Sequence, residues 1–169
     1  DARNPSKNSK PQQLHLDSSL PGQGGFALMM VVIFMLDDFT KDNGTTRIVP
    51  GSHLRSDYSE NNKEYDNEIS IEAKQGSVLI FDGSIWHGGG KKNSNDSRWA
   101  VIPSYGRSFI KPAFNFSENI PSDIFNQLTD ERKKLLGLNS CPPKDEFTRI
   151  TRLSNEYEWK KGYELPKTP

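Results

Sequence analysis

The sequence has one cysteine, no excess of charge of either sign and no long apolar run. The single cysteine, Cys141, excludes an internal disulfide and is compatible with a reducing compartment, so we expect a cytoplasmic protein. Lysine plus arginine and aspartate plus glutamate number 22 each, a balance that gives no indication of a nucleic-acid partner. The longest apolar run, residues 26–36, is far shorter than the about 20 residues that a membrane-spanning helix needs. We therefore expect no membrane partner, and small molecules are the candidate substrates.

The length and apolar content that the chain does have are enough for one core. It has 169 residues, 33% of them hydrophobic, which predicts a single domain over residues 1–169. The run 26–36 is rich in β-branched and aromatic residues, which predicts a strand buried on both faces. Its three methionines fit adaptable core packing better than metal ligation: Met29, Met30 and Met35.

The rest of the chain predicts antiparallel β-structure followed by a helix. Alternating apolar residues at 69–73 and an extended run at 78–81, separated by a Gln-Gly turn, predict a hairpin. From Ser122, apolar residues recur at helical spacing as far as Gly137, which predicts one amphipathic helix packed against the outside of the sheets. An irregular, proline-rich tail is expected after Cys141.

Three residues have the types and spacing of a metal site. His15 and Asp17 stand two apart, so on an extended strand both project from the same face. His87 ends the apolar stretch 78–87 and supplies a third ligand from a distant strand. By itself a His-x-Asp pair is more often a polar surface pair, but the combination is stronger. Two histidines and one carboxylate, with three positions left open, are typical of non-haem Fe(II) oxygenases, so iron is favoured over zinc.

An arginine close to this set suits the binding of a carboxylate. Arg98 opens the apolar stretch 98–105, which we expect to be the strand after the His87 turn. A guanidinium offers a buried carboxylate two parallel donors, whereas a lysine does not. Without His87, a surface arginine at a strand start would be the better interpretation. The third histidine, His53, lies in a Pro-Gly-Ser-His turn and is interpreted as a hydrogen-bonded turn residue, with a rival metal ligand as the alternative.

Three stretches resemble the phytanoyl-CoA dioxygenase family in content, order and spacing. They are the Leu-His-Leu-Asp sequence at 14–17, the stretch 43–53 with its Pro-Gly-Ser-His turn, and the stretch 76–98. The resemblance covers about two thirds of the chain. It implies a mainly β, double-stranded β-helix (a cupin-like jelly roll) with a C-terminal flanking helix, a fold that also suits the expected strands.

The resemblance also implies an activity. His15, Asp17 and His87 would be the catalytic ligands of Fe(II), and Arg98 would bind the far carboxylate of 2-oxoglutarate. The reaction would use O2, hydroxylate a small organic molecule and release succinate and CO2, with ascorbate as a stimulant. Asp17 favours hydroxylation, because related halogenases lack this carboxylate. The alternatives are a non-catalytic jelly-roll binding module and a cupin-type metalloenzyme that does not use 2-oxoglutarate, the latter disfavoured by Arg98.

The surroundings of the site are predicted less sharply. The family usually has a longer segment before its first ligand, so we expect part of the N-terminal region to be missing, and residues 1–13 to form a flexible loop. Arg47 and the polar loop 55–68 either line the substrate entrance or are solvated surface. The same choice between pocket and core applies to a set of further residues: Thr46, Trp86, Trp99 and Tyr105. The sequence predicts neither the substrate, nor the position hydroxylated, nor the oligomeric state.

Overall fold

The chain divides into two compact units, of which the first is Asp1–Arg107 and the second begins at Ser108. The computed structural model describes residues 1–22 and 25–138. Cys141 and the tail predicted after it lie outside these residues, and the prediction of a single domain stays a prediction. Within the described ranges, no helix is long and apolar enough to span a membrane.

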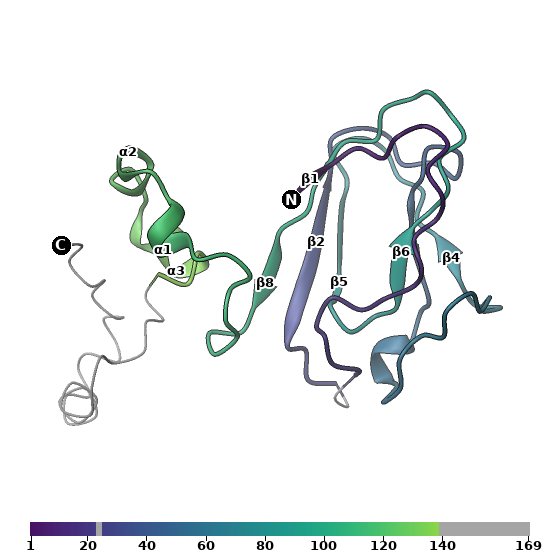
Figure 1. Ribbon diagram of the computed structural model, residues 1–169, viewed down its shortest axis with the longest axis horizontal. Helices are drawn as coiled ribbons and strands as arrows, with labels where there is room; N and C mark the ends of the chain where they lie inside the picture. Colours follow the sequence, from purple (N-terminus) through teal and green to yellow (C-terminus); the bar gives the residue numbers. More distant parts are fainter. Residues whose placement is uncertain (23–24, 139–169) are drawn as a thin grey trace. The chain divides into compact units, whose positions relative to one another are not determined.

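Two antiparallel sheets face each other in the first unit (Figure 1). The larger has the strand order β1-β7-β2-β5, and β8 also pairs with β2. Its strands are β1 (Ala2–Arg3), β2 (Met29–Met35), β5 (Val78–Asp82), β7 (Ala100–Val101) and β8 (Ser104–Gly106). The smaller sheet has the order β4-β3-β6. Its strands are β3 (Thr46–Ile48), β4 (Ile69–Ser70) and β6 (His87–Gly89).

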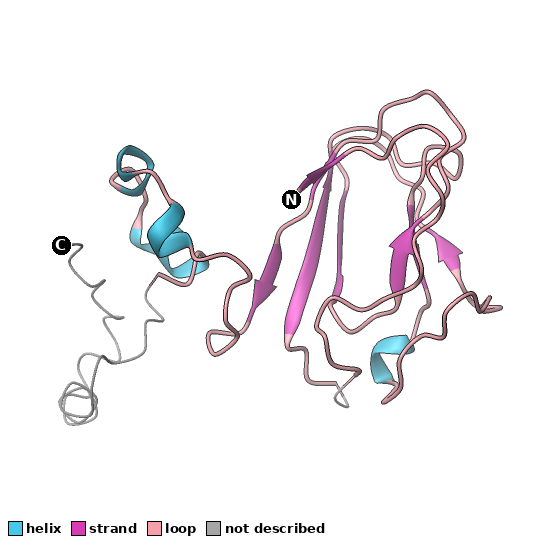
Figure 2. Cartoon of the chain, viewed as in Figure 1, coloured by secondary structure: helices cyan, strands magenta, loops and turns pink. Residues whose placement is uncertain are grey.

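Nearly all regular structure in the described part of this unit is strand, joined by loops and one turn of 3-10 helix, η1 (Ser52–Leu54) (Figure 2). The core lies between the sheets and draws its largest share from β2. Val31, Ile33 and Met35 point into it, and Ile48 of the smaller sheet packs against the same cluster. The mainly β architecture is as predicted, and Met35 is core packing.

The central strand β2 is buried more fully on one face than on the other. Its inward residues alternate with outward ones, as the pleat of a strand requires. Val32 on the outward face is also buried, but Phe34 is 40% exposed. The strand predicted over 26–36 is observed at 29–35. Burial on both faces holds at residues 31–33 and is wrong at Phe34 and at the exposed ends of the predicted run, Phe26 and Leu36.

The predicted hairpin of residues 69–81 is wrong. The turn is present, with Gly76 at φ 84°, but the two segments that it joins belong to different sheets. β4 pairs with β3, whereas β5 pairs with β2. Ala73 forms a bridge with Phe39 and packs against the core on the way across. Alternation of apolar residues reports which face of a strand is buried, and it does not identify the partner strand.

The predicted strand over 98–105 is split in two. β7 and β8 both pair with β2, at different places along it, and Ile102-Pro103 separates them. Proline has no backbone N–H to donate, so the ladder cannot run through it. The Pro103 carbonyl still accepts a hydrogen bond from the backbone N–H of Val32, 3.0 Å away.

The second unit holds three short helices: α1 (Phe116–Asn119), α2 (Ser122–Phe125) and α3 (Asp130–Leu135). The single helix predicted from Ser122 is therefore wrong. Thr129 has extended backbone angles, and its hydroxyl accepts a hydrogen bond from the N–H of Arg132, so it starts a new helix in the middle of the predicted one. Gly137, at φ 71°, ends α3 where the stop was predicted. Packing of a helix against the sheets stays a prediction.

Candidate metal centre

The segment before Asp17 alternates between two environments. Leu14 and Leu16 turn to one side, where they pack with Trp86 in a second apolar cluster. His15 and Asp17 turn to the other side and line a cavity between the two sheets. The segment is not a full strand, since a single bridge, between His15 and His87, joins it to β6. It is nevertheless extended enough to present both side chains to the same space, as predicted.

The same alternation places the third side chain. Trp86 is buried in the second apolar cluster, and His87, the next residue, points the opposite way into the cavity. Two backbone hydrogen bonds of 2.9 Å, one in each direction between His15 and His87, fix the two histidines side by side. The rings of Phe81 and His87 pack in an edge-to-face arrangement, with centroids 4.8 Å apart.

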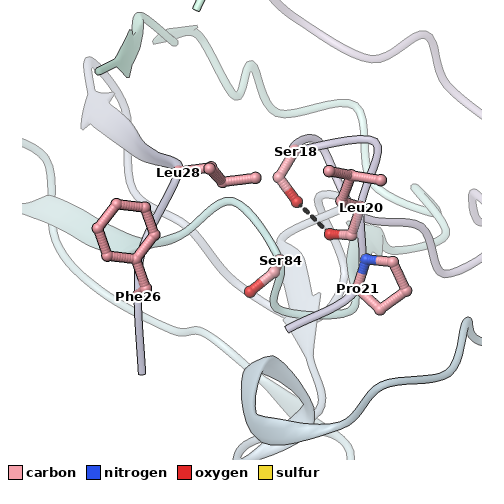
Figure 3. A pocket seen from close by; sticks show the side chains of 6 residues that line it. All are labelled: Ser18, Leu20, Pro21, Phe26, Leu28 and Ser84. Atoms are coloured by element: carbon pink, nitrogen blue, oxygen red, sulfur yellow. Dashed lines mark hydrogen bonds between the residues drawn. The ribbon is translucent and has the colours of Figure 1, made fainter. Parts of the chain in front are cut away.

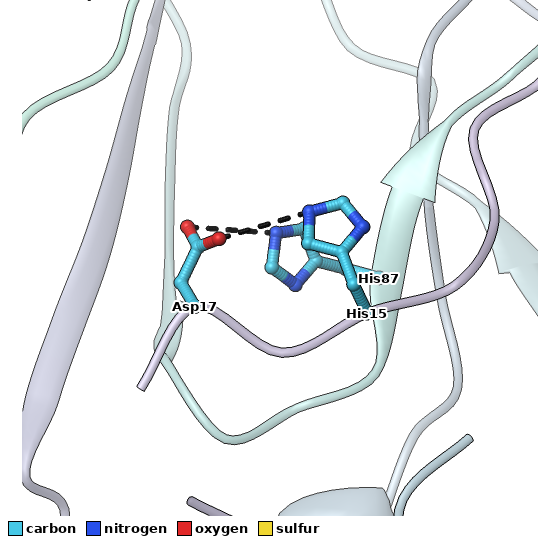
Figure 4. A group of neighbouring side chains, drawn as sticks. All are labelled: His15, Asp17 and His87. Atoms are coloured by element: carbon cyan, nitrogen blue, oxygen red, sulfur yellow. Dashed lines mark ion pairs between the residues drawn. The ribbon is translucent and has the colours of Figure 1, made fainter. Parts of the chain in front are cut away.

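The three side chains converge with their potential ligand atoms inward (Figure 4). The Nε2 atoms of His15 and His87 each lie 3.7 Å from a carboxylate oxygen of Asp17. One potential ligand atom from each residue lies within 4.8 Å of the others. Two imidazole nitrogens and one carboxylate oxygen around a common point fit a divalent transition metal.

The backbone sets the orientation of both imidazoles. The Nδ1 of His15 lies 3.0 Å from the carbonyl oxygen of Gln13, and the Nδ1 of His87 lies 3.0 Å from that of Ile85. A neutral imidazole that donates its Nδ1–H to a carbonyl presents the Nε2 lone pair to a metal. Burial lowers the pKa of His87, which favours the neutral form that metal binding requires. The orientation and the protonation of the two histidines therefore suit a metal ion bound between them and Asp17.

Arg98 enters the same cavity, which has a volume of about 120 Å³. The residue is 6% exposed, and its Nε has no hydrogen-bond partner among the described residues. The guanidinium lies 4.6 Å from the centre of the Phe39 ring and forms no ion pair in the described part of the chain. Burial, and then the neighbouring Arg3, lowers the pKa of Arg98 to about 10. A buried cation without a counter-ion is a binding group for an anion.

A second arginine, Arg3, lines this cavity and was not predicted. In the β1–β7 pairing Arg3 stands opposite Ala100, a core residue, and Arg98 lies two residues before Ala100. Both guanidinium groups therefore extend from the inner face of the larger sheet. Asp1 pairs with Arg3 at 2.8 Å and also lines the cavity. Only the tertiary pairing reveals Arg3, because nothing in its local sequence differs from a surface arginine.

Residues 1–13 are mostly loop, as predicted, but long-range contacts join them to the rest of the first unit. Residues 2–3 form β1, and the Asn4 side chain accepts a hydrogen bond from the backbone N–H of Arg98 at 3.0 Å. The buried Lys92 donates to the carbonyl oxygen of Pro5 at 2.9 Å. Gln12 then bonds Gly89 through both its backbone N–H and its side-chain oxygen. These contacts hold the segment against the first unit, and its flexibility stays a prediction.

Of the other residues named from the sequence, some line the cavity and others do not. Thr46 lines the cavity, whereas Trp86 belongs to the second apolar cluster. Several others are not among the lining residues: Arg47, His53, Trp99 and Tyr105. Sequence reasoning missed a further group of lining residues: Gln12, Val31, Ile33, Phe81, Ile102 and Ser104. The inward positions of β2 and β5 could have indicated three of these.

His53 lies in the predicted turn, where Gly51 adopts φ 83°. Its Nδ1 is buried and has no hydrogen-bond partner among the described residues, so the prediction of a fully hydrogen-bonded turn histidine is wrong at this atom. His53 is not part of the metal-ligand group either.

A second, shallow depression adjoins the segment after Asp17 (Figure 3). Phe26 and Leu28 lie on one side of it, and the Ser18 hydroxyl donates to the Leu20 carbonyl at 2.6 Å. It encloses no space for a water molecule and brings together no group of ionisable side chains.

Two facing antiparallel sheets with this ligand set between them define a double-stranded β-helix protein with a candidate metal centre. Solved structures share the fold. HygX of Streptomyces hygroscopicus, in a structure with nickel and 2-oxoglutarate bound, is 17% identical, with a TM-score of 0.54 over 65% of this chain and 57% of that one. AviO1 of Streptomyces viridochromogenes Tue57 is 21% identical, with a TM-score of 0.53 over 67% and 51%. The predicted fold class is confirmed.

The chain belongs to the phytanoyl-CoA dioxygenase family, whose model, Phytanoyl-CoA dioxygenase (PhyH), matches residues 3–100. Among its relatives, the dioxygenase cdmA of Talaromyces verruculosus is 30% identical over 76% of this chain and 45% of the relative. The dioxygenase aneA of Aspergillus aculeatus is 29% identical over 86% and 52%. An uncharacterized protein of Mycobacterium tuberculosis, Rv1501, is 28% identical over 67% and 41%. The chain thus spans about half the length of the curated relatives that it matches.

Proposed function

We propose that this chain carries the active site of an Fe(II)- and 2-oxoglutarate-dependent oxygenase that hydroxylates a small organic molecule. The observation that carries the proposal is the convergence of His15, Asp17 and His87 in the cavity that Arg98 enters as a buried, unpaired cation. Family membership, relatives named dioxygenases and a related fold that binds nickel with 2-oxoglutarate all support it.

Each residue has a distinct part in the proposed site. His15 and His87 would bind Fe(II) through Nε2 and Asp17 through a carboxylate oxygen, which leaves three coordination positions for cosubstrate and O2. Arg98 would hold the far carboxylate of 2-oxoglutarate through paired N–H donors. When bound, iron and 2-oxoglutarate would supply the oxidising power, with succinate and CO2 as by-products.

The cavity walls support this assignment. Val31, Ile33 and Phe81 form an apolar wall beside the ligand set, and such a wall excludes water from the reacting atoms. Asp17 fills a ligand position that related halogenases leave to chloride, so hydroxylation is the favoured outcome. The substrate itself would be found by screening small metabolites for stimulated succinate formation.

The test is an anaerobic titration of the full chain with Fe(II), 2-oxoglutarate and ascorbate. We expect the weak visible absorption band of the iron chelate in the wild type and its loss in His87→Ala. His53→Ala is the matched control, because His53 does not line the cavity, and it should keep the band. No band in the wild type, or an unchanged band in His87→Ala, would remove the metal assignment.

The alternatives give different results with the same samples. A non-catalytic jelly-roll binding module forms no succinate from 2-oxoglutarate. A cupin-type metalloenzyme that does not use 2-oxoglutarate binds the metal but shows no chelate band, and Arg98→Ala leaves its activity intact. For the proposed oxygenase, Arg98→Ala should raise the concentration of 2-oxoglutarate needed by about tenfold or more, since hydrogen bonds to charged groups contribute about 1.5–3 kcal/mol.

A further inference from the structure

Two of the three proposed ligands lie on a segment that forms no regular strand. His15 and Asp17 are at the edge of the smaller sheet, where one bridge joins their segment to β6. Separate backbone hydrogen bonds join Gln12 to Gly89 and Asp17 to Gly83. Their side chains are 42% and 34% exposed, against 9% for His87. A metal centre needs its ligands held within about 0.5 Å of the binding geometry. Because no continuous strand ladder holds the segment between these points, other contacts must add to its positioning.

Such contacts come from β3, through Arg47, and from the loop 55–68, through Ser59 and Asn62. The Arg47 guanidinium donates to the Gln12 carbonyl at 2.7 Å, and the Ser59 hydroxyl donates to the Leu14 carbonyl at 2.6 Å. Between them, the backbone N–H and side-chain oxygen of Asn62 pair with the side-chain amide of Gln13, both at 2.8 Å. We call Arg47, Ser59 and Asn62 the clasp.

The clasp surrounds the peptide that orients His15. The Gln13 carbonyl is the group that faces His15 Nδ1 at 3.0 Å. Ser59 holds the carbonyl after it, Arg47 holds the carbonyl before it, and Asn62 holds the Gln13 side chain. Rotation of this peptide would turn the imidazole and move Nε2 away from Asp17.

No clasp residue lines the cavity, so the clasp cannot act through contact with a substrate held there. Arg47 is itself fixed by an ion pair of 2.6 Å with Glu68, both residues being about four-fifths buried at the side chain. The loop 55–68 thus supports the ligand segment, and none of its residues lines the cavity; its place at the substrate entrance stays a prediction.

We propose that the clasp is a positioning device for the metal centre, which fixes the Gln13 peptide and thereby raises the affinity for Fe(II). The inference rests on the proposed function only in taking His15 as an Fe(II) ligand. Arg47, Ser59 and Asn62 are positioning residues, because they act through the ligand segment. Each lost hydrogen bond should weaken Fe(II) binding about fivefold.

The experiment titrates Fe(II) anaerobically into the full chain with saturating 2-oxoglutarate and follows the chelate band. Ser59→Ala removes one contact. Asn62→Gly removes another without backbone strain, since Asn62 has φ 58° and glycine adopts that conformation readily. The controls are Ser56→Ala and Asn61→Gly, whose wild-type residues are exposed and make no hydrogen bond or ion pair within the described residues.

We expect Ser59→Ala and Asn62→Gly each to raise the Fe(II) dissociation constant about fivefold, and the double variant to raise it further, while the controls match the wild type. Ser59→Thr keeps the hydroxyl and should restore binding. Thermal unfolding of the metal-free variants separates this effect from a loss of folding. Fe(II) affinities equal to those of the controls would overturn the proposal. A wild type without any chelate band would instead overturn the proposed function.

Discussion

At the scale of single residues, the buried charge of Arg98 suits its proposed binding role but lowers the stability of the fold. Its charge is buried, has no counter-ion among the described residues and has a pKa lowered to about 10 by burial and then by Arg3. A lowered pKa of a base means that the folded state disfavours the charged form, so at neutral pH this charge opposes folding. The stacking of the guanidinium on Phe39 offsets part of that cost.

Replacing the charge with an apolar side chain of similar length should therefore stabilise the metal-free protein. We expect Arg98→Met to raise the free energy of unfolding by about 1 kcal/mol, by analogy with the removal of other buried charges, while abolishing tight 2-oxoglutarate binding. Urea unfolding measures the first effect and the anaerobic titration the second. Arg107→Met is the control, because Arg107 also stacks on a phenylalanine but is exposed. A destabilised Arg98→Met would show that Arg98 has a counter-ion or that its stacking dominates.

The candidate ligands were predictable because the relevant information is local. Alternation within residues 14–17 determines that His15 and Asp17 share a side, and the step from Trp86 to His87 repeats the pattern. Arg3 was not predictable in this way. Its position depends on the pairing of β1 with β7, whose strands lie at opposite ends of the first unit's sequence.

At the scale of elements, the β1–β7 pairing adds positive charge beside the anion site. Arg3 and Arg98 extend from the same face, and Arg3 is 54% exposed at the side chain and paired with Asp1. Because exposure screens its charge, we expect only a modest role: Arg3→Gln should weaken 2-oxoglutarate binding by about two- to threefold. The wild-type affinity should fall with added salt more steeply than that of the variant.

The measurement is the 2-oxoglutarate dissociation constant at low and high ionic strength, read from the anaerobic chelate band. Lys10→Gln is the matched control, because Lys10 is an exposed cation of the same N-terminal segment that does not line the cavity. If both variants behave alike, the effect belongs to the net charge of the protein and not to the position of Arg3.

The elements that were predicted wrongly share one physical cause. The residues 69–81 have the alternation and the turn of a hairpin, yet β4 and β5 find partners in different sheets. The helical spacing from Ser122 continues through Thr129, yet the threonine hydroxyl caps a new helix there. Local periodicity states which side of a segment is apolar. The partner of a strand, and the point where a helix cap interrupts a helix, depend on contacts that the periodicity of the sequence does not specify.

At the scale of the first unit, a bound metal ion and 2-oxoglutarate would together link its two sheets. His87 belongs to β6 of the smaller sheet, whereas Arg98 leads into β7 of the larger one. A molecule bound to both the metal and Arg98 would therefore be lost on unfolding, and its binding free energy would add to stability. At a ligand concentration of 100 times the dissociation constant the gain is about 2.7 kcal/mol.

Thermal unfolding of the full chain should show this gain in two steps. Fe(II) should raise the unfolding temperature, and 2-oxoglutarate should raise it further only when the metal is present; removal of the metal by EDTA should reverse both steps. His87→Ala should lose both increments, because the metal site is incomplete. Arg98→Met should keep the Fe(II) increment and lose most of the second one, because the metal ligands are untouched while the far carboxylate has no partner. A full 2-oxoglutarate increment in Arg98→Met would mean that another group, with Arg3 the nearest candidate, binds that carboxylate.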